Sequence, residues 1–226
     1  MIVVVEGKRR REMDAAELAE RMSSAGTSRV VIDVGTGDGR FAYAYASAHP
    51  DAFVVGVDAI AERLEELSAK AARKPAKGGR PNVVFVRATV EDLPSELTGV
   101  ADEVHVLLPW GALLVGAMLA EAPVMAGIAG LAKPGAEVVV VFNAEVWEDS
   151  TPKDMADLPA VTVDCVRSWL APRYAAFGLD VLDAHELSPD EVGALSTTWA
   201  RKLAHGRHPK FVHLRARRAP PRPPAP

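Results

Sequence analysis

The sequence predicts a single α/β domain built on a doubly wound, mostly parallel β-sheet. Three observations favour this fold. The chain of 226 residues is long enough for one domain with a sizeable core. Short apolar runs alternate with helical patterns along most of its length. One of these runs, residues 30–34, leads directly into a glycine-rich segment and then into a helical pattern, as a strand–turn–helix unit does.

The remaining elements follow from apolar periodicity and from helix-capping and turn residues. The expected strands cover residues 2–5, 9–13, 30–34, 53–58, 83–87, 104–108, 137–142, 179–186 and 211–215, the first two as a hairpin. The expected helices cover residues 14–23, 41–49, 60–73, 113–131 with an interruption at Pro123, 166–177, and a segment that starts at Ser188. We expect one domain over residues 1–217, with residues 1–13 as an N-terminal hairpin extension, and a disordered Pro- and Arg-rich tail over residues 218–226.

Composition narrows the class of protein. A single cysteine, Cys165, excludes a disulfide framework and a cysteine-based zinc site, and we expect no metal. No apolar run reaches the length needed to span a membrane, and the N-terminal residues do not form a signal peptide. We therefore expect a cytoplasmic protein with no membrane partner.

Charge is distributed unevenly along the chain. The net charge is −4, but the segment from Trp199 to the end has no acidic residue and carries +8, which leaves −12 for the rest. Residues 68–90 also lack acidic residues and contain six Lys or Arg. Basic patches on an acidic body are typical of a selective nucleic-acid binder, although solubilising charge and a disordered tail explain the charge pattern equally well.

The segment Asp33-Val-Gly-Thr-Gly-Asp-Gly39 is the strongest cofactor signal. Glycines between a strand and a helix expose backbone N–H groups to a ligand. A dinucleotide fingerprint requires a third glycine where this chain has Arg40. Gly-x-Gly-x-Gly after an acidic residue instead resembles motif I of S-adenosylmethionine (SAM) methyltransferases, in which the loop surrounds the amino-acid end of the cofactor. A tight turn without a ligand is the less favoured alternative.

Polar residues also follow the next two strands. Asp58 comes about twenty residues after the glycine loop, where a carboxylate accepts hydrogen bonds from a ribose diol. Its position before residues 59–60 also suits helix capping. After the third strand, Val90 is expected to pack against an adenine ring, and Thr89 or Glu91 to make a polar contact with it.

The fourth strand of the core ends at Leu107-Leu-Pro-Trp-Gly111. Enzymes that methylate an exocyclic base amine carry Asp or Asn where this chain has Leu107. Pro109 and Trp110 remain as a surface on which a base can stack. A ring nitrogen with a free lone pair fits such a site, because it requires no deprotonation before methyl transfer. The alternative for Trp110 is a buried core aromatic. Farther along, every charged residue after Trp199 is basic, which indicates either base stacking with phosphate binding or a buried Trp beside solvated cations.

Taken together, five segments resemble the aminoglycoside-resistance 16S rRNA methyltransferases that modify N1 of adenine 1408. They are Gly-Thr-Gly-Asp-Gly-Arg, Lys-Pro-Ala-Lys-Gly-Gly, Asn-Val-Val-Phe-Val, Leu-Pro-Trp-Gly and Trp-Ala-Arg-Lys-Leu-Ala-x-Gly-Arg. The resemblance runs from the N-terminal hairpin to about Arg215. It implies a class I SAM-dependent, Rossmann-like methyltransferase with a seven-stranded sheet. It also implies that a monomeric enzyme acts on helix 44 of the 30S subunit and confers resistance to kanamycin- and apramycin-type drugs.

The resemblance also implies site residues. Trp110 and Trp199 would clamp the flipped base, with Pro109 beside them. SAM, released as S-adenosylhomocysteine, would be bound by Asp33, Gly35, Thr36, Gly37, Asp38, Asp58, Thr89, Val90, Glu91, Leu107 and Thr197. The rRNA would be contacted by Lys8, Arg9, Arg73, Lys74, Lys77, Arg80, Arg201, Lys202, Arg207 and Lys210. The chain departs from the family at Pro209, where a cation is expected, and Lys210 is its expected replacement.

Two other functions stay open on the sequence alone. The first is a SAM-dependent methyltransferase that acts on another RNA or on a small molecule. The second is a nucleotide- or RNA-binding module without catalysis. The basic C-terminal segment disfavours a small-molecule substrate, and SAM binding distinguishes a methyltransferase from a non-catalytic module.

Overall fold

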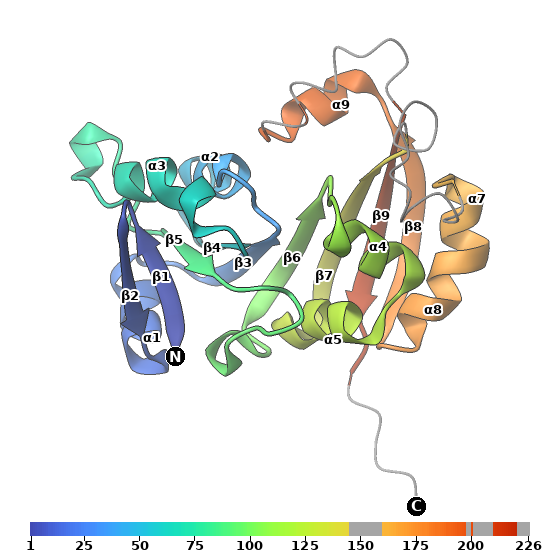
Figure 1. Ribbon diagram of the computed structural model, residues 1–226, viewed down its shortest axis with the longest axis horizontal. Helices are drawn as coiled ribbons and strands as arrows, with labels where there is room; N and C mark the ends of the chain where they lie inside the picture. The colour runs from blue at the N-terminus through green and yellow to red at the C-terminus, as the bar shows by residue number, and fades with distance from the viewer. Residues whose placement is uncertain (145–159, 198–199, 201–209, 221–226) are drawn as a thin grey trace, which may run out of the picture.

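The computed structural model describes residues 1–144, 160–197, 200 and 210–220 of the chain. Within them, nine strands form one sheet in the order β2-β1-β5-β4-β3-β6-β7-β9-β8 (Figure 1). The strands are β1 Ile2–Glu6, β2 Arg9–Met13, β3 Arg29–Val34, β4 Ala52–Asp58, β5 Val83–Arg87, β6 Ala101–Leu107, β7 Ala132–Asn143, β8 Leu179–Leu187 and β9 Phe211–Arg218. The helical segments are α1 Ala15–Ser24, α2 Arg40–Ala48, α3 Ala61–Ala71, η1 Pro75–Lys77, η2 Ser95–Leu97, α4 Ala112–Leu119, α5 Ala122–Leu131, α7 Val163–Cys165, η4 Val166–Leu170, α8 Ala171–Ala175 and α9 Pro189–Ala194.

The centre of the sheet is parallel. Strands β5, β4, β3, β6 and β7 pair in parallel in that spatial order. Strand β4 is buried along its whole length, since both faces of a parallel sheet are covered by helices. The carboxyl ends of these strands therefore meet along one edge of the sheet, which is where α/β proteins bind their ligands.

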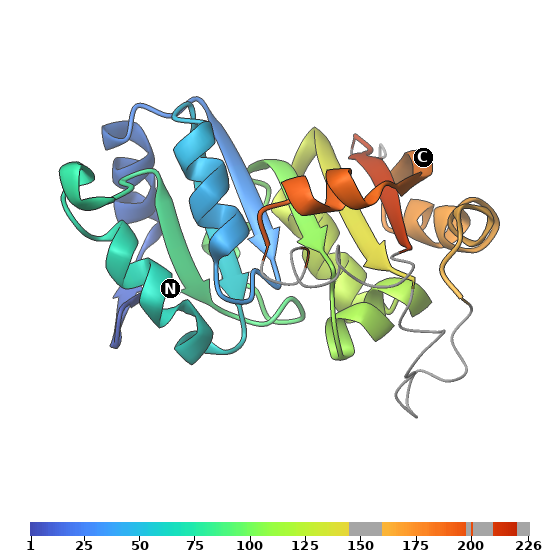
Figure 2. The ribbon, with the colours of Figure 1, turned by 90° about the horizontal axis from the view of Figure 1, so that it is seen from above.

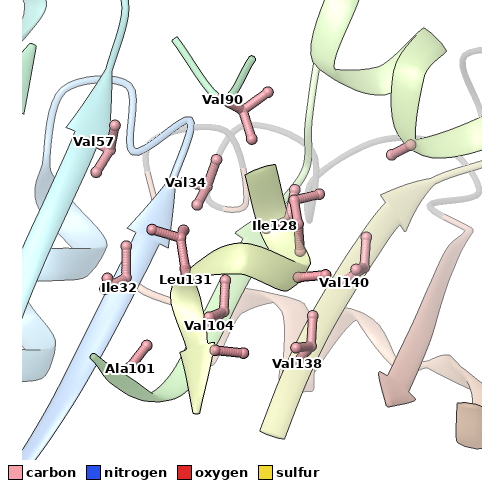
Figure 3. Packing of buried hydrophobic residues seen from close by; sticks show 14 of the residues in the cluster. Ile32, Val34, Val57, Val90, Ala101, Val104, Ile128, Leu131, Val138 and Val140 are labelled. Atoms are coloured by element: carbon pink, nitrogen blue, oxygen red, sulfur yellow. The ribbon is translucent and has the colours of Figure 1, made fainter. Parts of the chain in front are cut away.

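Helices cover both faces of the sheet (Figures 1 and 2). On one face, Ala42 and Ala46 of α2 and Leu64 of α3 pack against the strand residues Val31 and Val54. On the other face, α4, α5 and α8 bury a second, larger cluster. Figure 3 shows part of that cluster, in which Ile128 and Leu131 of α5 lie over Ile32, Val104 and Val138. The doubly wound architecture is thus confirmed.

All nine expected strands are present, but the expected seven-stranded, mostly parallel sheet with the hairpin outside it is not confirmed. The described residues form a sheet of nine strands instead of seven, and only four of its eight neighbouring pairs are parallel. The hairpin adds two strands, because β1 pairs antiparallel with β5. At the other end, β9 pairs antiparallel with both β7 and β8. Local sequence patterns predict the strands, but these pairings join segments far apart in the chain.

The expected helix over residues 113–131 is two helices. It is broken at Ala120, whose φ is 52°, instead of at Pro123. Pro123 lies in the first turn of α5, where its missing N–H costs no helical hydrogen bond. No single helix in the described residues is long and apolar enough to cross a membrane; α4 and α5 pass that test only as a pair bent by 89°.

Two helix starts agree with their capping residues. The Asp14 side chain accepts a hydrogen bond from the Glu17 N–H at the start of α1. Ser188 and Glu191 form a reciprocal capping box at the start of α9. The expected helix over residues 166–177 starts earlier, because the Thr162 side chain caps α7, and it includes the π-helical segment η4.

Candidate active site

A cavity of about 580 Å³ opens at the carboxyl ends of four parallel strands. Its size is that of a small-molecule or cofactor site. Four segments line it: residues 33–38 at the end of β3, 57–60 at the end of β4, 88–91 after β5, and 107–110 with 112–113 at the end of β6. Arg63 and Thr197 complete the lining. Every residue predicted to bind the cofactor lines this cavity, as do Pro109 and Trp110: Asp33, Gly35, Thr36, Gly37, Asp38, Asp58, Thr89, Val90, Glu91, Leu107 and Thr197.

The glycine loop adopts backbone conformations that favour glycine. Gly35, Gly37 and Gly39 have φ values of 71°, 63° and 78°. A Cβ atom on Gly39 would lie 2.4 Å from the Phe85 ring, so this position also lacks room for a side chain. At Gly37 nothing lies within 4 Å of such an atom, so the loop leaves open space beside its backbone. The loop is fixed to β4 by hydrogen bonds from the Gly35 and Thr36 N–H groups to the Val57 carbonyl oxygen, 2.8 and 3.0 Å long.

Asp33 lies at the end of β3 and is 2% exposed. Burial raises the pKa of its carboxyl group to about 6, and the Thr36 hydroxyl and His105 partly offset this shift. The Thr36 hydroxyl donates a hydrogen bond to Asp33 Oδ2. A buried carboxylate at a cavity wall is stabilised by a cationic ligand, because the ligand charge compensates for lost hydration.

Asp58 is 7% exposed, and both of its carboxylate oxygens bind backbone groups. Oδ2 accepts the Gly37 N–H at 2.9 Å, and Oδ1 accepts the Ile60 N–H at 2.9 Å. The capping alternative is therefore partly right, since Asp58 orders the start of α3 although Ile60 is the N-cap residue. Each carboxylate oxygen can accept a second hydrogen bond. Asp58 thus holds the glycine loop and keeps acceptor capacity for a ligand.

The third wall is mixed in character. Val90 is buried and is one of the residues that line the cavity, while Glu91 is exposed. Thr89 pairs with Asp92 in an isolated antiparallel bridge, so the segment after β5 turns back on itself. An apolar side chain beside polar groups suits a flat heteroaromatic ring.

The wall after β6 has a strained backbone. Leu108 has a φ of 53°, a value that is uncommon for residues other than glycine. The proline that follows it also favours an extended backbone at Leu108, so this conformation is strained. Its N–H donates to the Val141 carbonyl oxygen at 2.8 Å, and its side chain is buried. Gly111 follows with a φ of 59°. Between them, Trp110 is 58% exposed and lines the cavity, so the core alternative is wrong, while its role in base stacking stays a prediction.

Thr197 comes to the same cavity from the C-terminal part of the chain. Its Oγ1 accepts a hydrogen bond from the Ala200 N–H at 2.8 Å. Ala200 is fully buried in a cluster that includes Leu107, Leu108 and Val192 of α9, so Ala200 packs near the end of β6. Trp199, the second predicted stacking residue, lies outside the described residues.

The predicted rRNA-binding residues divide into described and undescribed groups. Lys8 and Arg9 are exposed at the hairpin turn, which is tied to α3 by a 2.9 Å hydrogen bond from the Gly7 N–H to Ser68 Oγ. Arg73, Lys74 and Lys77 are exposed in and before η1, which follows the C-terminal end of α3. Lys210 is exposed before β9. Three predicted residues lie outside the described part of the chain, namely Arg201, Lys202 and Arg207.

The basic loop is anchored by α2. The Tyr43 hydroxyl donates to the Gly78 carbonyl oxygen at 2.6 Å, and Arg80 lies over the Tyr43 ring. Arg80 also donates to Ser47 Oγ at 2.7 Å, so this predicted rRNA contact has a structural role in the described residues. The loop therefore presents Arg73, Lys74 and Lys77 from a fixed base.

Sequence reasoning missed several lining residues. Ile60 and Arg63 reach the cavity from the start of α3, and Leu113 reaches it from α4. Leu113 also lies 2.6 Å from the position of a Cβ on Gly35, so it packs directly on the glycine loop. The helix expected from residue 60 carried a signal for Arg63, because one helical turn separates it from Ile60.

The arrangement fits a cofactor with an ammonium group on its amino-acid end, a ribose and a flat base. Asp33 supplies a buried carboxylate, Asp58 supplies free acceptor capacity, and Val90 supplies an apolar surface. The glycine loop supplies room beside Gly37. SAM has all three parts, and it supplies a methyl group activated by a sulfonium centre.

Comparison with known proteins points to one family. Residues 3–218 match the family model described as NpmA: 16S rRNA (adenine(1408)-N(1))-methyltransferase. A protein of that name from Streptoalloteichus tenebrarius is 44% identical over 203 residues, which cover 90% of this chain and 92% of the relative. One from Escherichia coli is 34% identical over 219 residues, 94% of this chain and 97% of the relative.

Solved structures give the same result. A variant of the 16S rRNA (adenine(1408)-N(1))-methyltransferase from Catenulisporales acidiphilia, crystallised with its cosubstrate SAM, superposes with a TM-score of 0.90 at 41% identity over the full length of both chains. The 16S rRNA methyltransferase KamB superposes with a TM-score of 0.89 at 42% identity, over 97% of this chain and 100% of the other. The aminoglycoside resistance methyltransferase NpmB1 gives 0.80 at 38% identity, over 97% and 100%.

Proposed function

Because this chain belongs to the family of 16S rRNA (adenine(1408)-N(1))-methyltransferases, we propose that it methylates N1 of adenine 1408 in the decoding site of the small ribosomal subunit. The chain is a SAM-dependent methyltransferase of the aminoglycoside-resistance type. The finer proposals concern what each wall of its cavity does.

The walls after β3 and β4 bind the cofactor. Asp33 pairs with its ammonium group, and Asp58 accepts hydrogen bonds from its ribose. The loop at Gly37 leaves room for the amino-acid end, and Val90 packs against the adenine ring. These roles are supported by the burial of both carboxylates and by their position on one cavity.

The wall after β6 receives the target base. Trp110 offers an exposed aromatic face at the mouth of the cavity, and we assign the opposite face of the base to Trp199. Flipping a base out of its stack costs a few kcal/mol, and aromatic stacking returns about 1–3 kcal/mol per base. N1 of adenine has a free lone pair, so no general base is required. The aromatic faces also stabilise the positive charge that the base acquires on methylation.

The basic residues dock the enzyme on folded rRNA. Arg73, Lys74 and Lys77 on the anchored loop, with Lys8 and Arg9 at the hairpin turn, would contact phosphates around helix 44 of the 30S subunit. Arg201, Lys202, Arg207 and Lys210 would do so near the target base. We propose that the enzyme acts as a monomer and as one domain over residues 1–217, in the cytoplasm where its ribosomal substrate is found.

The exposed Trp110 at the mouth of a cavity with two buried carboxylates carries this proposal. Primer extension on 16S rRNA from cells that express the chain tests it directly. We expect a reverse-transcriptase stop at adenine 1408 and growth on kanamycin and apramycin. Unmodified rRNA at that position, with full expression of the protein, would contradict the proposal. Methylation of free nucleosides or of another RNA without 30S subunits would favour the alternative substrates.

A further inference from the structure

Three potential metal-binding side chains lie together on the strand pair β8–β9, which the methyl-transfer site does not use. They are Asp183 and His185 of β8 and His213 of β9, and one ligand atom from each lies within 4.8 Å of the others. His185 and His213 are directly opposite each other in the antiparallel register, with ring centroids 4.7 Å apart. Two imidazoles on paired positions of neighbouring strands project from the same face of the sheet.

A register shift in β8 brings the third group, the Asp183 carboxylate, to the same face of the sheet as the two histidines. The pairing with β9 is irregular between Val181 and Asp183, and the extra residue, Leu182, is exposed. Such a bulge changes the direction of the side chains that follow it. Asp183 and His185 are then two residues apart on one strand and share a face. Asp183 Oδ2 lies 2.8 Å from His185 Nδ1, close enough for both atoms to exchange this contact for bonds to one ion.

His213 presents a nitrogen that lacks a protein partner. Its Nδ1 atom is buried and makes no hydrogen bond within the described residues. A buried, unpaired ring nitrogen is costly in a folded protein unless a ligand satisfies it.

The surrounding charges permit a cation. Arg215 lies beside the cluster, but its guanidinium is 3.5 Å from the Glu137 carboxylate, which offsets its charge. Asp183 contributes the nearest negative charge. The side chains of His185 and Asp183 are 46% and 42% exposed, so they have room to move the short distance that coordination requires. Zinc–nitrogen bonds of about 2.0–2.1 Å bring two ligands to roughly 3.4 Å of each other.

We propose that Asp183, His185 and His213 form a binding site for a divalent transition-metal ion, Zn²⁺ in the first place, on the outer strand pair of the sheet. Two imidazoles and a carboxylate suit Zn²⁺ better than Mg²⁺ or Ca²⁺, which prefer oxygen ligands only. Three protein ligands leave a coordination position for water. This proposal does not depend on the proposed methyl transfer.

Zinc titration of the chelator-treated full chain, followed by calorimetry, tests the site, with Co²⁺ as a spectroscopic substitute. We expect one saturable equivalent in the wild type and in the control variant His49→Gln, which removes an imidazole at the end of α2. His185→Gln should abolish saturable binding, and Asp183→Asn should weaken it by about 10- to 100-fold. Retained SAM binding will show that each variant is folded.

Two results would overturn the assignment. One is a wild-type chain that takes up no Zn²⁺ at stoichiometric concentrations. The other is a His185→Gln variant that binds Zn²⁺ as tightly as the wild type, which would place the ion at other residues. Neither result bears on rRNA methylation, so the failure of this proposal is distinguishable from that of the proposed function.

Discussion

The two sides of the active-site cavity are built differently. On the cofactor side, Asp58 holds the glycine loop and the start of α3 through main-chain hydrogen bonds, and Asp33 is fully enclosed. On the acceptor side, Trp110 is exposed between two residues with positive φ, one of them the strained Leu108. In the proposed function, the cofactor is therefore held by a preorganised, buried frame. The base stacks on an exposed aromatic side chain that is carried by a strained backbone turn.

The largest expected effect comes from disturbing the cofactor frame at Gly39. Gly39→Ala combines a φ of 78° with a Cβ only 2.4 Å from Phe85, so it should lower the free energy of unfolding by about 2–5 kcal/mol. Gly26→Ala is the matched control, since its φ is 68° but nothing lies within 4 Å. It should cost only about 1–2 kcal/mol. Urea unfolding measures both, and equal losses would mean that the contact with Phe85 is unimportant.

The next effect concerns the pH dependence of stability. The pKa of Asp33 is about 6 in the folded protein and 3.8 ordinarily. Between pH 3.8 and about 6, the folded protein therefore keeps a proton on Asp33 that the unfolded chain has lost. Stability from this group is therefore lost as pH rises from about 4 to about 6 and stays lost above that range. Asp33→Asn removes this cost and should stabilise the apo protein by up to roughly 3 kcal/mol at neutral pH. It should also weaken SAM binding about 10- to 150-fold, because a charged hydrogen bond is lost.

Asp51→Asn is the control for that prediction. Asp51 is exposed, and a hydrogen bond from Arg29 lowers the pKa of its carboxyl group. Its stabilising contribution is present at neutral pH and is lost as pH falls, which is the opposite sign. The variant should therefore gain no stability at neutral pH. Thermal melts of both variants across the pH range measure the difference, and a destabilised Asp33→Asn apo protein would contradict the account of Asp33.

The smallest effect tests the strain on the acceptor side. Leu108→Ala and Leu108→Gly both remove the same buried side chain, but only glycine relieves the φ of 53°. The glycine variant should be the more stable by about 1 kcal/mol, the reverse of the usual order, in which glycine is worse than alanine. Denaturant unfolding of the pair gives the answer. If the alanine variant is the more stable, the turn stores no strain.

Much of the cofactor side could be predicted from sequence. The glycine loop after one buried strand and the acidic residue after the next can both be recognised from short stretches of sequence. They lie side by side because parallel strands end at the same edge of the sheet. Arg63 and Leu113 were missed because their contribution depends on how α3 and α4 are rotated. The pairing of the hairpin with β5 was missed because no local pattern selects that distant edge. The strain at Leu108 could not be predicted from sequence, because a Leu before Pro favours an extended backbone. The observed conformation depends on the tertiary packing of the Leu108 side chain, which overrides that local preference.

The cofactor side and the acceptor side of the cavity have separate tasks, and the variant Trp110→Ala is the sharpest test of this division. SAM affinity by calorimetry and methylation of 30S subunits are measured on the same protein. We predict unchanged SAM affinity and a methylation rate about 5- to 150-fold lower, the equivalent of about 1–3 kcal/mol of lost stacking. Full methylation, or a loss of SAM binding parallel to the loss of methylation, would contradict the claim.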